Sequence, residues 1–231
     1  MRIWDIHPGY LNRQSLLGEH RELHGIASII THNKKGYSKH PETLRWLEYG
    51  WALTARHNLL SAEMQLRSFN ERTPLHMPSN EGLWPPMYID QPGAQFAILA
   101  EKYKAKEKGR IVLPNTPQEI WSHHKYSILA RDHGMYKEIG RRVSTMKPND
   151  NFSELAQLLT ETIRYPPSLG GIKNALQHMW GHVSNAYSGS RKEVSTWSLG
   201  DLLAKTQKIA VAIKEPYLLH STALSELKIW L

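Results

Sequence analysis

The stretch NRQSLLGEHRELHGIASIIT, residues 12–31, decides the fold expected for the first half of the chain. At 100° per residue, five of its apolar side chains fall on one broad stripe, the pattern of an amphipathic helix packed against a core. Asn12 is of a type that caps helices, so the sequence predicts a helix that starts there and ends near Thr31. The stripe consists of Leu16, Leu23, Ile26, Ala27 and Ile30.

The polar residues of this helix differ in their position relative to the stripe. Arg21 points nearly opposite to it, toward solvent or a ligand, whereas Glu22 lies at its edge, where a carboxylate can be half desolvated and still reach a groove. Glu19 falls closer to the centre of the stripe and competes with Glu22 for a chemical role. Either carboxylate can instead form a structural ion pair with a neighbouring Arg or His, and periodicity alone favours that interpretation.

Outside this helix, helical patterns dominate and alternating strand patterns are scarce, so the sequence predicts an all-α protein. A long irregular loop is expected at 73–95, which contains five prolines and two glycines. The proline-containing segment 113–117 marks a boundary between two helical domains, at 1–114 and 115–231. Further helices are expected at about 41–69, 95–108, 117–146, 153–164, 168–187, 198–213 and 216–230.

Composition limits the kinds of protein that this chain can be. Its 231 residues and 40% hydrophobic content suffice for one large or two small globular domains. No apolar run approaches the roughly 20 residues needed to cross a bilayer, and no signal peptide is recognisable, so we expect a cytoplasmic protein with no membrane partner. Cysteine is absent, which excludes disulfides, thiolate zinc sites and a thiol nucleophile.

The net charge of +8 and the isoelectric point near 9.6 favour a polyanionic partner, because positive potential attracts phosphates before any specific contact forms. The excess is spread along the chain, with one dense stretch at 102–110. Lysines in such a run either contact DNA or form a solvated charged face, and the sequence favours neither interpretation.

Three blocks of the first half resemble the pyrimidine-dimer DNA glycosylase family typified by phage endonuclease V. They are Met1-Arg2-Ile3, Arg21-Glu22-Leu23 and the nine residues AEMQLRSFN at 62–70. Trp4, His7-Pro8, Lys35-Gly36-Tyr37 and His40-Pro41 also resemble bacterial members, and the similarity covers about the first 75 residues. It implies an endonuclease V-like helical domain that acts in base excision repair, in a prokaryotic or viral, nucleoid-associated setting.

The resemblance further implies a bifunctional DNA N-glycosylase and abasic-site (AP) lyase that acts on cyclobutane pyrimidine dimers. Its nucleophile would be the N-terminal α-amine, here that of a retained Met1, since the large Arg2 should block removal of the methionine. Glu22 would be the acid/base partner. An α-amine has a reference pKa of about 7.7 to 8.0, so a useful fraction is unprotonated near neutral pH, and no metal or other cofactor is required.

The expected partner is double-stranded damaged DNA, with no obligatory protein partner. Arg2, Arg21, Lys34 and Lys35 are expected to contact its phosphates. The chain departs from the phage pattern at Ser15 and Gly25, where the phage enzyme has a His and an Arg. A catalytically inactive or differently specific DNA-binding protein of the same fold therefore remains an alternative.

Approximately residues 117–187 resemble the YbgA-type domain of unknown function, which is helical and implies no reaction. His178 and His182 lie one helical turn apart and could face His124 or His133 across a bundle. Without a metalloprotease glutamate or any cysteine, packed or surface histidines are the better interpretation, and no metal ligand is assigned. Trp121 and Trp180 are expected to be core residues rather than base-stacking platforms.

Overall fold

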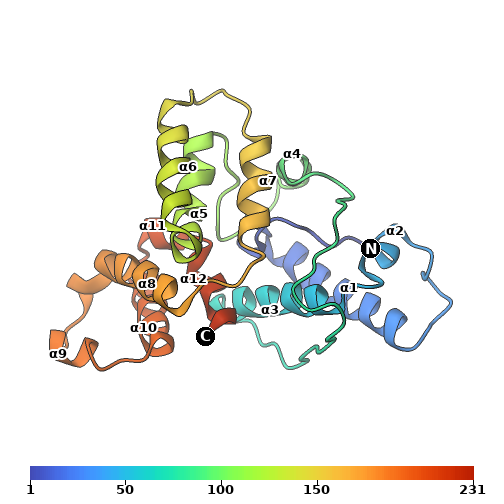
Figure 1. Ribbon diagram of the computed structural model, residues 1–231, viewed down its shortest axis with the longest axis horizontal. Helices are drawn as coiled ribbons and strands as arrows, with labels where there is room; N and C mark the ends of the chain where they lie inside the picture. Colours follow the sequence, from blue (N-terminus) through green and yellow to red (C-terminus); the bar gives the residue numbers. More distant parts are fainter. The chain divides into compact units, whose positions relative to one another are not determined.

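The computed structural model describes residues 1–231 and is built from helices without a β-strand, which confirms the all-α prediction (Figure 1). It divides into two compact units, Met1–Gly109 and Arg110–Leu231. No helix has the length and apolar character required to span a membrane.

The first unit begins with an extended segment that leads into α1, and the predicted bounds of α1 are confirmed. The Asn12 side chain accepts a hydrogen bond from the Ser15 amide and caps the helix. Four of the five stripe residues are buried, Ile30 being partly exposed, and this face packs on α3 and α2. The elements of the unit are η1 (Pro8–Tyr10), α1 (Arg13–Thr31), α2 (Pro41–Trp46), α3 (Gly50–Leu66) and α4 (Pro92–Lys102).

The prediction of one continuous helix over 41–69 is wrong, because the chain breaks between α2 and α3. Ser79, in the long loop before α4, supplies hydrogen-bond partners for the first free amides of α3. Its hydroxyl accepts from the Gly50 amide at 3.2 Å, and its carbonyl accepts from the Trp51 amide at 3.0 Å. A helix that starts here leaves its first amides without intrahelical partners, so these tertiary bonds stabilise the break.

The helix predicted at 95–108 starts earlier and ends earlier, at Pro92 and Lys102. Tyr103 is buried, and its hydroxyl accepts a hydrogen bond from the Asn12 amide at 3.0 Å. The Asn12 side-chain amide in turn donates to the Glu107 carbonyl at 3.1 Å. These bonds hold the segment after α4 against the start of α1 in a non-helical conformation.

In the second unit, α5 packs against α8, α6 and α7, and α10 packs against α8. The predicted helix 117–146 is wrong as a single element, because Asp132 breaks it and caps α6 by accepting from the Met135 amide. The prediction at 216–230 is wrong as well, since three short helices replace one. The elements are α5 (Pro117–Arg131), α6 (His133–Thr145), α7 (Ser153–Thr162), α8 (Leu169–Val183), η2 (Ser184–Ala186), α9 (Arg191–Val194), α10 (Leu199–Ala212), α11 (Pro216–Leu219), α12 (Ala223–Glu226) and η3 (Leu227–Trp230).

Close contact between α5 and α8 depends on a glycine in the first turn of α8. A Cβ added at Gly171 would lie 1.9 Å from the carbonyl oxygen of Ala130, whereas one added at Gly170 would meet nothing within 4 Å. Gly171→Ala should therefore destabilise the second unit by about 2 kcal/mol or more through overpacking, and Gly170→Ala should leave it unchanged or slightly more stable. Urea denaturation of both variants checks this, and equal midpoints would contradict the packing described.

Candidate active site

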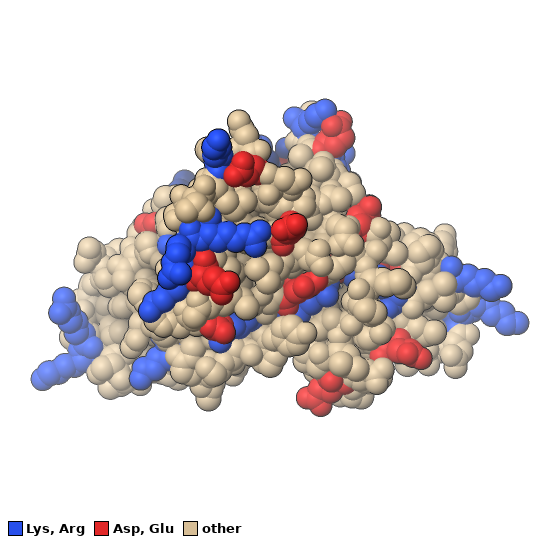
Figure 2. Space-filling model, turned by 45° about the horizontal axis from the view of Figure 1, so that its top comes forward, with Lys and Arg blue, Asp and Glu red and all other residues tan.

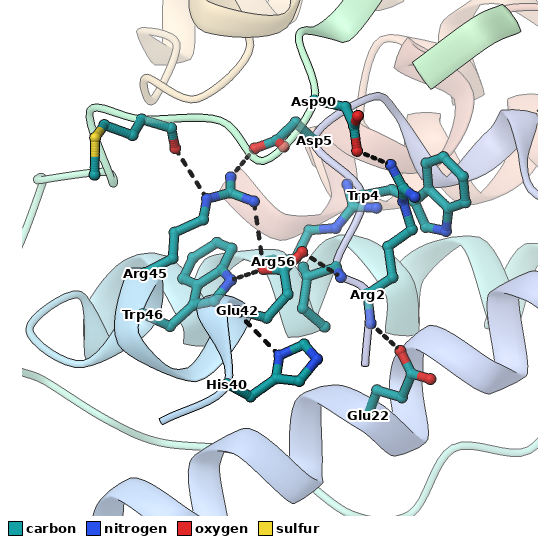
Figure 3. Close-up of polar contacts among 12 residues, drawn as sticks. Arg2, Trp4, Asp5, Glu22, His40, Glu42, Arg45, Trp46, Arg56 and Asp90 are labelled. Carbon is teal, nitrogen blue, oxygen red and sulfur yellow. Dashed lines mark hydrogen bonds and ion pairs between the residues drawn. The ribbon is translucent and has the colours of Figure 1, made fainter. Parts of the chain in front are cut away.

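The first residues of the chain run extended without a partner strand, so their amides must find other acceptors. Side chains from α1, α2 and α4 provide these acceptors, and three of them are carboxylates, of which Figure 3 shows Glu22 and Glu42. Because each amide has its own partner, the position of the chain start is fixed. The pairs are Arg2 with Glu22, Ile3 with Glu42 at 3.1 Å, Trp4 with Glu19 at 3.2 Å, and Asp5 with Gln95 at 2.8 Å.

Two of these carboxylates are buried and are neutralised by buried arginines. Glu19 forms a bidentate pair with Arg56, whose Nε and Nη2 donate at 2.7 and 2.9 Å. Burial is the main influence on Glu19 and raises its pKa to about 7, against the lowering effect of Arg56. Arg45 bonds to Asp5 and lies 3.5 Å from Glu42, and burial likewise raises the pKa of Glu42. This network holds the N-terminal segment on the helices.

Glu19 therefore has a structural role, and loss of its carboxylate should lower the stability of the first unit. Glu19→Gln leaves the guanidinium of Arg56 buried without a carboxylate, so we expect the first unit to lose about 3 kcal/mol of stability. Thermal and urea unfolding of the full chain measure the loss. A variant as stable as the parent would show that the Glu19–Arg56 pair does not hold the segment.

Glu22 differs from Glu19 because it is only half-buried and has no arginine partner recorded in the structure. Its carboxylate accepts from the Arg2 amide, and Figure 3 shows it directed from α1 toward the chain start. Two carbon atoms separate the Met1 α-amine from that amide nitrogen, so the two nitrogens are within about 4 Å of each other. The Met1 α-amine thus lies one residue from the amide that the Glu22 carboxylate binds, at a partly exposed position.

The cations predicted to contact DNA lie in different settings. Arg2 is engaged within the protein, because its guanidinium pairs with Asp90 and lies 4.4 Å from the centre of the Trp4 ring. Arg21 is exposed on α1, which ends about 15 Å further along its axis at Thr31. Lys34 and Lys35 are exposed just beyond that end. The Lys34 ammonium donates to the Ser28 hydroxyl at 2.7 Å. The last turns of α1 therefore separate Arg21 from Lys34 and Lys35, and the three cations do not cluster around Glu22.

No single basic patch dominates the face shown in Figure 2, where Lys and Arg are interspersed with Asp and Glu. In the dense stretch 102–110, Lys104 pairs with Glu101 at 2.6 Å while both side chains are 72% exposed. Such an exposed pair is typical of a solvated charged face, which is the interpretation it supports for Lys104.

The third sequence block, residues 62–70, supplies an arginine that holds the backbone in place. Arg67 pairs with Glu63 at 2.7 Å and donates to the carbonyls of Leu11 at 2.8 Å and Gly9 at 3.1 Å. These carbonyls lie between the extended segment and α1. Arg67 therefore fixes the bend that returns the chain from its start to the helix that carries Glu22.

The histidines considered in the second unit do not assemble into a metal-binding group. His124 is buried, its Nδ1 lies 2.9 Å from the Ile120 carbonyl, and burial lowers its pKa to about 4. His182 Nε2 lies 2.7 Å from the Tyr126 hydroxyl, while His178 and His133 are exposed. Trp121 and Trp180 are both partly exposed; Trp121 contacts Tyr136, and Trp180 contacts Tyr187 and Trp197.

Other residues that hold the chain start, among them Arg56 and Gln95, were not identified from the sequence, because their partners are distant in it. Arg56 is 37 residues from Glu19, and Gln95 is 90 residues from Asp5. Glu42 could have been noticed from its place directly after His40-Pro41, where the His40 Nδ1 accepts from the Glu42 amide and caps α2.

Comparison with known proteins finds one family match in each unit. Residues 1–77 match the family of pyrimidine dimer DNA glycosylases, and residues 125–220 match a family described as protein of unknown function (DUF1722). Both matches agree with the resemblances seen in the sequence. The first supports, at the level of the family, a DNA glycosylase for pyrimidine dimers, with DNA as its substrate. No curated protein and no solved structure matches the chain.

Proposed function

We propose that the protein excises cyclobutane pyrimidine dimers from double-stranded DNA, with the Met1 α-amine as nucleophile and Glu22 as acid/base. The observation that carries this proposal is the contact of the Glu22 carboxylate with the Arg2 amide, next to the α-amine. An α-amine of ordinary pKa is unprotonated in a useful fraction near neutral pH, whereas a lysine side chain needs a perturbed environment to be so. The ordered chain start and the half-buried carboxylate therefore suit imine chemistry.

In the proposed reaction, the neutral amine bonds to C1′ while the glycosidic C1′–N bond breaks and its electron pair leaves with the pyrimidine, which takes up a proton. Loss of an amine proton and opening of the sugar ring give a Schiff base. The Glu22 carboxylate then removes a 2′ proton, and the C3′–O bond breaks to release the 3′ phosphate ester. Hydrolysis of the imine frees the amine.

The surroundings of Glu22 support its role in this reaction. Its partner is a neutral amide, so the carboxylate keeps its negative charge available to a cationic intermediate. Glu19 and Glu42, by contrast, are committed to buried arginines. Of the three carboxylates at the chain start, Glu22 is therefore the one suited to exchange protons with substrate.

We propose that DNA is contacted by the exposed side chains of Arg21, on α1, and of Lys34 and Lys35, just after it. Arg2 would have to give up its ion pair with Asp90 in order to contact a phosphate. The enzyme must also displace a base to reach C1′, and this costs less at a poorly stacked lesion than in intact duplex.

An inactive DNA-binding protein is the second candidate, and Ser15 and Gly25 motivate it. Ser15 is buried, so its difference from the phage pattern concerns packing rather than a surface contact. Gly25 has open space at its Cβ position, so the Arg that the phage enzyme has there is absent without being replaced by another group. That difference bears on substrate affinity more than on the amine and the carboxylate.

Incubation with a duplex that carries one thymine dimer separates the candidates. The proposal predicts a nick at the dimer that leaves an unsaturated aldehyde on the 3′ end, with no nick in the undamaged duplex. A duplex with a single abasic site should be cut by the same elimination. Tight binding to the dimer without cleavage of either duplex would overturn the proposal and favour the binding protein.

A further inference from the structure

Three histidines and one glutamate meet within the first unit, apart from the contacts that hold the chain start. His20 and His24 lie one turn apart on α1, His57 lies on α3, and Glu71 lies in the loop after α3. The three imidazole rings pack against one another with centroid separations of 4.7, 4.9 and 5.1 Å. One ligand atom from each of the four residues lies within 4.8 Å of all the others.

These four side chains are largely buried, so polar atoms among them that lack a hydrogen-bond partner destabilise the fold unless a ligand binds them. The side chains of His57, Glu71 and His20 are only 2%, 8% and 15% exposed. The Nε2 atoms of His20 and His57 are buried and make no hydrogen bond, and Glu71 Oε1 lies 3.6 and 4.0 Å from them. Buried polar atoms of this kind normally have a hydrogen-bond partner, and leaving one unpaired is costly.

The electrostatic environment of the cluster is also consistent with a bound cation. Burial is the main cause that lowers the pKa of both His20 and His57, and the neighbouring histidines lower it further. Burial acts to raise the pKa of Glu71, but hydrogen bonds from the Thr73 amide and from the Thr73 and Ser61 hydroxyls outweigh it and lower that pKa.

We propose that His20, His24, His57 and Glu71 bind a divalent transition-metal ion, with zinc as the best match. Three imidazole nitrogens and one carboxylate oxygen form a tetrahedral ligand set that zinc accepts, with metal–ligand distances of about 2.0 to 2.2 Å. Ligand atoms then lie about 3.4 Å apart, so side-chain movements of about 1 Å close the present arrangement. The Thr73 hydroxyl, now 3.2 Å from His24 Nε2, would give up that contact.

The proposed ion has a structural role, because four protein ligands leave no position for a substrate. It ties α1 to α3 and anchors the start of the loop 67–91, which is otherwise irregular. Ser61 and Thr73 orient the Glu71 carboxylate from outside the ligand set, as partners of metal ligands commonly do. This site does not depend on the proposed glycosylase reaction.

Metal analysis of the full chain tests the proposal directly. Protein stripped with a chelator, then incubated with zinc and dialysed, should retain equimolar zinc and melt at a higher temperature than the stripped protein. Cobalt should bind in place of zinc and give the intense visible bands of a tetrahedral site. Retention of no zinc above background would overturn the proposal.

Two variants and one control locate the ion. His24→Gln and Glu71→Gln should each weaken zinc binding by at least about 10-fold, since each removes one of four ligands. His178→Gln alters an exposed histidine of the second unit and should bind zinc as the parent does. If both ligand variants fold, as judged by circular dichroism, and retain zinc with parental affinity, the assignment is wrong.

Discussion

One residue added before Met1 is expected to abolish dimer-specific strand cleavage. The addition moves the α-amine by more than 3 Å from its place beside Glu22, and misplacement of a reacting group by 1 Å already costs about 10²-fold. We therefore expect the cleavage rate on dimer-containing duplex to fall by at least about 10²-fold. Single-turnover assays with protein of verified intact mass measure it.

The matched control adds the same residue after Leu231, in the second unit, and should cleave like the parent. Binding of both proteins to dimer-containing duplex should remain within a few-fold of the parent, because the phosphate contacts are unchanged. Full cleavage by the N-terminally extended protein would show that the α-amine is not the nucleophile.

Glu22→Gln is expected to lower cleavage by about 10² to 10⁴-fold, the range over which general acid/base groups contribute. The amide oxygen of glutamine can still accept from the Arg2 amide, so the chain start should keep its position. What the variant loses is the negative charge and the basic oxygen. DNA binding should therefore change by less than a few-fold while cleavage collapses.

Glu101→Gln provides the control, because Glu101 is exposed in the same unit and pairs only with the exposed Lys104. It should cleave and bind like the parent. If Glu22→Gln lost binding and cleavage in equal measure, the carboxylate would be a structural element. If it cleaved normally, another base would have to remove the 2′ proton.

Helix bounds that depend on neighbouring residues could be predicted from the sequence, whereas those that depend on distant residues could not. The Asn12 cap and the apolar stripe lie within one helix, so the bounds of α1 could be predicted. The break before Gly50 depends on Ser79, which is 29 residues away in the loop, and local periodicity does not contain that information. Asp132, a good capping residue inside an expected long helix, was a local signal of the second break.

The candidate site likewise combines features that local sequence predicts with features that depend on distant residues. Position on the stripe correctly placed Arg21 in solvent and Glu22 at the edge, but the buried pair of Glu19 depends on Arg56, which local sequence does not place. The histidine cluster was missed because His57 and Glu71 join it only through the fold. The spacing of His20 and His24 was its one local sign.

The most direct test of the central proposal is borohydride reduction during reaction with dimer-containing duplex. Reduction of a Schiff base fixes the enzyme to the sugar, and mass spectrometry of the digested adduct identifies the attached amine. The account predicts a covalent adduct on the peptide that starts at Met1, through its α-nitrogen. An adduct on a lysine side chain, or cleavage without a trapped adduct, would contradict it.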